Sequence, residues 1–188
     1  MHLLMLAPTL PFPPHQGGAL RNFGLIHGLS VAGHAVTLLC FHNGSPSVAS
    51  TPLAHLCHRV ITVPTPARPS SRRLLDLVMS GQPDLARRLE SPAFSESLTA
   101  LLRERRFDLV QFEGLEMAGW LPLVRQHQPH TSLCYDAHNA EYVLQQAIFA
   151  VDRETTRRCP SAAYSMVQSR RIHRFEREVC ANVNCVLA

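Results

Sequence analysis

Short apolar runs alternate with longer amphipathic stretches along the whole chain, and this alternation constrains the fold more than any other feature. The runs at residues 2–7 and 35–41, HLLMLA and AVTLLCF, are apolar at nearly every position. Such a strand is buried on both faces, as in a parallel sheet that helices cover on both sides. We therefore expect an α/β fold: a Rossmann-like, doubly wound, mostly parallel sheet flanked by helices, in a single domain over residues 1–188.

The same periodicity predicts the order of the elements. Strands are expected at residues 2–7, 35–41, 59–63, 108–113, 132–136 and 183–188. Helices are expected at residues 19–32, 95–105, 117–126, 141–151 and 162–181. Loops are expected at residues 8–16 and 42–58, and an irregular region with short helical pieces such as 72–80 at residues 64–95. The last strand reaches the final residue with no following loop, so we expect the protein to continue beyond it.

A pair of glycines, Gly17 and Gly18, opens the first expected helix after the proline-rich segment PFPPHQ. A helix N-terminus carries free N–H groups and the positive end of the dipole, so the pair predicts a seat for a phosphate or another anion. The alternative is a tight turn that needs glycine only for its geometry. The spacing matches neither G-x-G-x-x-G nor the P-loop pattern, which argues against a dehydrogenase, a kinase or a GTPase. Further along this helix, Arg21 and Asn22 are expected to face away from its apolar side.

The segment YDAHNAEY, residues 135–142, follows the fifth expected strand. Carboxyl ends of strands face the ligand crevice in open α/β sheets, so Asp136, His138, Asn139 and Glu141 are the best candidates for chemistry. Carboxylate, imidazole and amide groups can orient sugar hydroxyls or stabilise a leaving group. Alternatively, the Asp and Asn side chains only cap the next helix and the histidine is a loop residue.

The strand before it, DLVQFE, delivers Glu113, Gly114 and Glu116 to the same edge of the sheet. The two carboxylates could bind the hydroxyls of an acceptor. Equally, they could cap the following helix, because acidic residues favour a helix N-terminus.

Composition narrows the classes of partner. All 18 basic residues are arginine and the net charge is +4, which fits a protein that handles anionic sugar nucleotides or rests on an anionic membrane, and also many that do neither. The basic and apolar stretch at residues 68–88 could lie on such a membrane or could be a surface helix. No run is long enough to span a bilayer, so membrane contact would be peripheral. The arginines are not interleaved with aromatic residues, so no nucleic acid is expected.

The 6 cysteines form no C-x-x-C pair, which is typical of a reduced, cytoplasmic chain. Cys40 and Cys134 lie in apolar runs and are expected in the core. The cluster at His55, Cys57 and His58 lacks a second pair of ligands, so no metal site is expected.

Taken together, these stretches resemble the N-terminal, acceptor-side domain of GT-B fold glycosyltransferases of the family 4 type, which include bacterial polysaccharide and lipid-linked sugar transferases. The resemblance covers nearly the whole chain and rests on the segments MHLLMLAPTLPFPPHQGGALRNF, LSVAGHAVTLLCF, DLVQFEG, YDAHNAEY and REVCANVNCVLA. It implies that Gly17 and Gly18 face the donor phosphates and that His138 lies near the reacting sugar. It also implies that Glu113 and Asp136 line the acceptor side. Arg21, Asn139 and Glu141 are expected on the acceptor side or elsewhere along the cleft.

The resemblance further implies the reaction, a retaining transfer of a sugar from a nucleotide-diphosphate donor to a glycan or lipid-linked acceptor. It implies no cofactor and no metal, and a place in the cytoplasm or peripherally on the inner membrane face. The carboxylate-x7-glutamate pattern and basic pair that hold the donor belong to the family's C-terminal domain and are absent here, so the chain alone is expected to be inactive. The alternatives are a non-catalytic binding or assembly subunit that pairs with a separate donor-binding domain, and half of a nucleotide-sugar 2-epimerase.

Overall fold

A single parallel sheet forms the centre of the protein. The computed structural model describes residues 1–15, 17–44, 47–67, 69, 80–138, 143, 147 and 160–188. Within these residues, six strands pair in the order β3-β2-β1-β4-β5-β6, and every neighbouring pair is parallel. The strands are β1 His2–Ala7, β2 Ala35–His42, β3 Arg59–Pro64, β4 Leu109–Glu113, β5 Ser132–Asp136 and β6 Cys185–Leu187. The expected α/β, Rossmann-like fold is confirmed.

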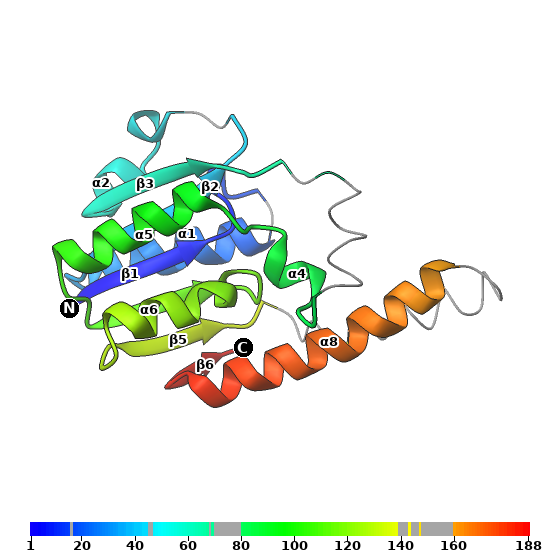
Figure 1. Ribbon diagram of the computed structural model, residues 1–188. Coiled ribbons are helices and arrows are strands. Elements are labelled where there is room, and N and C mark those ends of the chain that lie inside the picture. The colour runs from blue at the N-terminus through cyan, green and yellow to red at the C-terminus, as the bar shows by residue number, and fades with distance from the viewer. Residues whose placement is uncertain are drawn as a thin grey trace.

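Helices cover the two faces of the sheet, which explains why the strands are apolar at consecutive positions. Leu4 and Leu6 of β1 pack in one cluster with Phe94 of α5, Pro92–Glu104, and with side chains of α6, Leu121–His127. Met5 of β1 packs on the opposite face with Ile26 of α1, Gly17–Val31. Figure 1 shows α5 and α6 on one side of the sheet and α1 on the other.

The helix α8, Pro160–Asn182, packs with Ile172 and Val179 against Tyr135 of β5. It delivers the chain to β6, which pairs with β5 at the edge of the sheet, while the first half of α8 extends beyond the sheet (Figure 1). Among the described residues, no helix is both long enough and apolar enough to cross a bilayer.

Several boundaries differ from the expected ones. The α5 helix begins at Pro92 and not at residue 95, because the hydroxyl of Ser91 caps it by accepting the Phe94 N–H at 3.3 Å. The expected helix at 117–126 is a 3₁₀ turn, η2 Met117–Trp120, followed by α6, and Pro122 lies in the first turn of α6, where no N–H is needed.

The prediction of a loop at residues 42–58 is partly wrong. This connection contains a 3₁₀ turn, η1 Val48–Ser50, and a short helix, α2 Leu53–Leu56. The helix forms because Leu53 and Leu56 pack onto the same side of the sheet as α1. In the irregular region, the structure describes one short helix, α4 Asp84–Arg87. The expected pieces at 72–80 and 141–151, and the basic stretch from 68 to 79, lie almost wholly outside the described residues.

Candidate functional site

The polar candidates gather at the carboxyl edge of the sheet. Glu113 ends β4 and Asp136 ends β5, and the two are partners in the register of these parallel strands. The strand order reverses between β1 and β4, and ligands of open α/β sheets bind in the crevice outside such a switch point. The α1 helix begins at the same edge because it follows β1 through the loop at residues 8–15.

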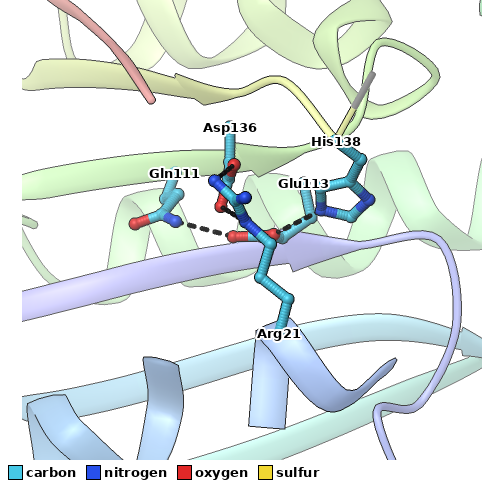
Figure 2. A network of polar contacts seen from close by, with 5 residues as sticks. All are labelled: Arg21, Gln111, Glu113, Asp136 and His138. Carbon is cyan, nitrogen blue, oxygen red and sulfur yellow. Dashed lines mark hydrogen bonds and ion pairs between the residues drawn. The ribbon is translucent and has the colours of Figure 1, made fainter. Parts of the chain in front are cut away.

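Glu113 is the buried centre of this site, with an exposed fraction of 0%. Gln111 Nε2 donates to its Oε1 at 2.7 Å, and His138 Nε2 lies 3.1 Å from its Oε2 (Figure 2). Asn22 is a further partner. In the amide orientation that satisfies its neighbours, Asn22 Nδ2 donates to Glu113 Oε2 at 2.7 Å and to the Gly18 carbonyl oxygen at 3.2 Å.

The surroundings change the acidity of both members of the Glu113 and His138 pair. Burial raises the pKa of Glu113, and the hydrogen bonds from His138 and Gln111 only partly oppose this effect. The hydrogen bond with Glu113 raises the pKa of His138, the charges of Glu113, Asp136 and Glu116 add to it, and burial opposes it. Both groups therefore keep a proton to higher pH than they would in water.

Asp136 has a different partner. Arg21 of α1 donates from Nη2 to Asp136 Oδ1 at 2.6 Å and from Nε to Oδ2 at 3.2 Å. The Asp136 side chain is 1% exposed and the Arg21 side chain 41%, so the guanidinium covers the carboxylate and faces outward (Figure 2). A two-point contact of this kind fixes orientation as well as charge.

The glycine pair lies beside this network. A Cβ atom built on Gly18 would lie 3.5 Å from Nδ1 and 3.6 Å from Cε1 of His138, so the imidazole rests against the first turn of α1. The same atom on Gly17 would meet nothing within 4 Å. Among the predicted residues, the structure thus brings Gly18, Arg21, Glu113, Asp136 and His138 together at one edge.

Asn139 and Glu141 lie outside the described residues. Glu116 turns away to Arg88, with Nη2 and Oε1 2.7 Å apart. Between the end of β4 and Glu116, Gly114 adopts a φ of +79°, a backbone conformation that favours glycine, and the chain changes direction there.

Three of the clustered residues could be considered as metal ligands. One ligand atom from each of Glu113, Asp136 and His138 lies within 4.8 Å of the others. Both Asp136 oxygens, however, already accept from Arg21, and both Glu113 oxygens accept from amide or imidazole donors. A metal ion would have to displace the Arg21 guanidinium, so the donor set fits an internal ion pair better than a metal.

Two members of the site, Asn22 and Gln111, are missed by reasoning from the sequence. Asn22 is expected to face away from the apolar side of its helix, and this prediction is wrong, since it is 4% exposed. Gln111 is 3% exposed inside the strand DLVQFE. For Gln111 the available signal is an amide inside an otherwise apolar strand, because buried amides need hydrogen-bond partners.

Comparison with solved structures agrees with the fold. A sucrose-phosphate synthase from Thermosynechococcus elongatus superimposes with a TM-score of 0.61 and 16% identity, over 99% of this chain and 42% of that one. At this identity the likeness shows the fold alone, and the chain spans well under half of that enzyme. The C-terminal domain of a Pyrococcus furiosus hydrogenase matches with a TM-score of 0.44 and 17% identity, over 71% of this chain and 89% of that one, which is too weak to support any inference.

Comparison of sequences identifies the family. No curated protein matches the chain significantly. Residues 16–188 match the sequence model of the glycosyl transferase 4-like domain, nearly the whole length of the chain. The chain therefore belongs to the family of glycosyl transferase 4-like domains.

Proposed function

We propose that the chain is the acceptor-side domain of a retaining glycosyltransferase, which moves a sugar from a nucleotide-diphosphate donor to a glycan or lipid-linked acceptor. One observation carries the proposal beyond family membership. The imidazole of His138 is held between the buried Glu113 and Gly18 of the first turn of α1, at the carboxyl edge beside the switch point. A histidine in such a crevice, oriented by a buried carboxylate, can act on a bound substrate.

The chemistry follows from the two ring nitrogens. His138 Nε2 faces Glu113, which leaves Nδ1, beside Gly18, as the nitrogen for a ligand. A protonated His138 and the N-terminus of α1 both favour an anion, and departure of a nucleotide diphosphate develops negative charge at this place. In this proposal Gly17, Gly18 and His138 stabilise the departing diphosphate, and no covalent intermediate with the protein forms. Retention rests on the resemblance to family 4 enzymes.

Arg21 and Asp136 have a supporting place in the same proposal. Their ion pair joins α1 to the end of β5, and so keeps Gly18 and His138 at a fixed separation. The outward side of Arg21, with Asn139 and Glu141, would line the acceptor side of the cleft.

We further propose that a C-terminal donor-binding domain completes the site and supplies the groups that hold the diphosphate. The enzyme would work in the cytoplasm, in peripheral contact with the inner membrane face when the acceptor is lipid-linked.

The test uses the natural gene product that contains this domain. It is incubated with UDP-glucose, GDP-mannose or ADP-glucose and with lipid or oligosaccharide acceptors, and both diphosphate release and labelled product are measured. His138→Ala should lower turnover at least about a hundredfold. The control is His27→Ala, an exposed histidine of α1 outside the polar cluster, which should leave turnover unchanged.

Two results would contradict the proposal. An isomerised donor without a transferred sugar would identify half of a 2-epimerase. Full turnover by His138→Ala would remove this histidine from the reaction.

A further inference from the structure

The Glu113 carboxylate is held at both of its oxygens. Oε1 accepts from Gln111, and Oε2 accepts from Asn22 and contacts His138. The terminal torsion of a glutamate is normally broad, so a carboxylate with a single partner could rotate and take the histidine with it. Donors on both oxygens remove this freedom.

The two amides that hold Glu113 come from rigid elements. Asn22 lies in the second turn of α1 and Gln111 in the middle of β4, and both are buried. The Asn22 amide also donates to the carbonyl of Gly18. It therefore links the two groups between which the His138 ring lies, the Glu113 carboxylate and the first turn of α1.

Simple stabilisation of the core would not require this arrangement. A buried amide without a partner destabilises a protein, and apolar residues at positions 22 and 111 would fill the same space with no need of partners. Glu113 is the partner that the two amides share, and its Oε2 also contacts His138. The whole set of bonds thus ends on one imidazole.

We propose that Asn22 and Gln111 are positioning residues for His138, and that they act through Glu113. They fix the carboxylate, the carboxylate fixes Nε2 as the nitrogen that carries the proton toward the core, and Nδ1 is thereby presented to the crevice. This inference rests on the proposed role of His138 in sugar transfer. The other charged groups near the ring have ion-pair partners other than the amides: Asp136 pairs with Arg21, and Glu116 pairs with Arg88. We therefore expect them to stay in place when the amides are replaced.

The test replaces each amide by an apolar side chain of similar size, in Asn22→Leu and Gln111→Met. The matched control is Gln128→Met, because Gln128 is another buried amide and Glu113 is not among its partners. Its Nε2 donates to the Leu102 and Arg105 carbonyls, and its Oε1 accepts from the Phe107 N–H and the Thr131 hydroxyl. Two readouts are needed, the ¹⁵N resonances of the histidine rings, with His138 assigned by its loss in His138→Ala, and steady-state kinetics of the natural gene product.

At a pH above its raised folded pKa, where the ring is neutral, we expect the ¹⁵N resonances of His138 to show the proton on Nε2 in the wild type and a mixture of tautomers in both variants. Turnover, kcat, should fall on the order of tenfold, as for other outer partners of functional histidines, with little change in the KM of the donor. The control should unfold more easily but change neither the resonances nor kcat. If Asn22→Leu does not fold, Asn22→Ser tests the same contact, since its hydroxyl is too short to reach Glu113.

Unchanged His138 resonances in the Asn22 and Gln111 variants would overturn the positioning role, whatever the kinetics. Changed resonances with an unchanged kcat would instead overturn the proposed role of His138 in transfer. The two failures can therefore be distinguished.

Discussion

Arg21 and Asp136, 115 residues apart in the sequence, meet in a two-point ion pair that joins the first helix to the end of the fifth strand. The carboxylate is almost fully buried, whereas the guanidinium is partly exposed. The pair therefore neutralises a charge that the fold has removed from water, and it sets where α1 lies over the carboxyl edge of the sheet.

Removal of one partner should destabilise the protein. In Arg21→Met the Asp136 carboxylate stays buried without its cation, and we expect a loss of about 2 kcal/mol, less than for a fully buried pair because Arg21 is partly exposed. Urea unfolding measures the change. Arg21→Met/Asp136→Asn should recover much of the loss, and Arg174→Met, which breaks the exposed pair with Glu178, should show no measurable change. An equal effect of the two arginine substitutions would contradict this prediction.

The Gly18 position should tolerate no bulk beside His138. In Gly18→Val the added methyl groups would press on a ring that already lies 3.5 Å from an ideal Cβ atom, so the contact with Glu113 should weaken. We expect activity to fall by on the order of tenfold or more, because a small displacement of a reacting group is costly. Gly24→Val, in the same helix with nothing within 4 Å of its Cβ, is the control. Equal activity of these two variants would show that the Gly18 contact does not matter.

The pKa shifts predict a fall in stability as the pH rises. His138 has a raised pKa in the folded state, so its contribution is complete below its unfolded pKa of about 6.5 and is lost as the pH rises through the folded pKa. Glu113 also has a raised pKa in the folded state. Above about pH 4.5, its unfolded pKa, the unfavourable free energy of burying its charge therefore begins to lower the stability of the folded protein. The free energy of unfolding should therefore decrease as the pH rises above about 4.5, where Glu113 begins to contribute, and further above about 6.5, where His138 does.

The control for this prediction is Glu113→Gln, which removes the buried charge and the cause of the shift at His138. Its unfolding free energy, measured in urea at each pH, should depend less on pH than that of the wild type. Glu96→Gln, at an exposed position of α5, should follow the wild type. Parallel curves for the wild type and Glu113→Gln would place the titrating groups elsewhere.

The cysteines that the structure describes should fall into two classes of reactivity. Burial raises the pKa of Cys40 to about 12, of Cys57 to about 11 and of Cys134 to about 12, whereas Cys180 and Cys185 are exposed. Because the thiolate is the reactive form, iodoacetamide at pH 8 should label the buried thiols on the order of a hundredfold more slowly. Peptide mapping by mass spectrometry measures the rate of labelling at each cysteine. Cys134 is opposite Cys185 in the register of β5 and β6, so rapid labelling of Cys134 would mean that β6 does not protect β5.

The central strands could be predicted closely from the sequence. The bounds of β1 and β5 agree with those expected, because a strand buried on both faces leaves a continuous apolar run that ends at a proline or a charged residue. The meeting of Glu113 with Asp136 was also predictable, since parallel strands end at one edge.

The contacts within the site could not be predicted in the same way. Whether Arg21 reaches Asp136 or Glu113 depends on how α1 is rotated about its own axis. Hydrophobic periodicity does not fix this rotation closely enough to decide. The same uncertainty hid Asn22, whose amide faces the site from a helix that otherwise buries apolar side chains. The start of α5, by contrast, could have been predicted. A serine followed by a proline, as in Ser91 and Pro92, is typical of a helix N-terminus, whereas the periodicity alone placed the start three residues later.

Because Glu113 has no exposed surface, we expect a substrate to meet its charge only indirectly, and among the described residues His138 is the titratable partner that carries this influence to the crevice. A ligand at the crevice would thus respond to the packing around β4 without contacting it. In the proposed glycosyltransferase, substitutions in the core of this domain would then tune activity as well as substitutions in its binding surface, and adaptation need not be confined to residues that contact the substrate.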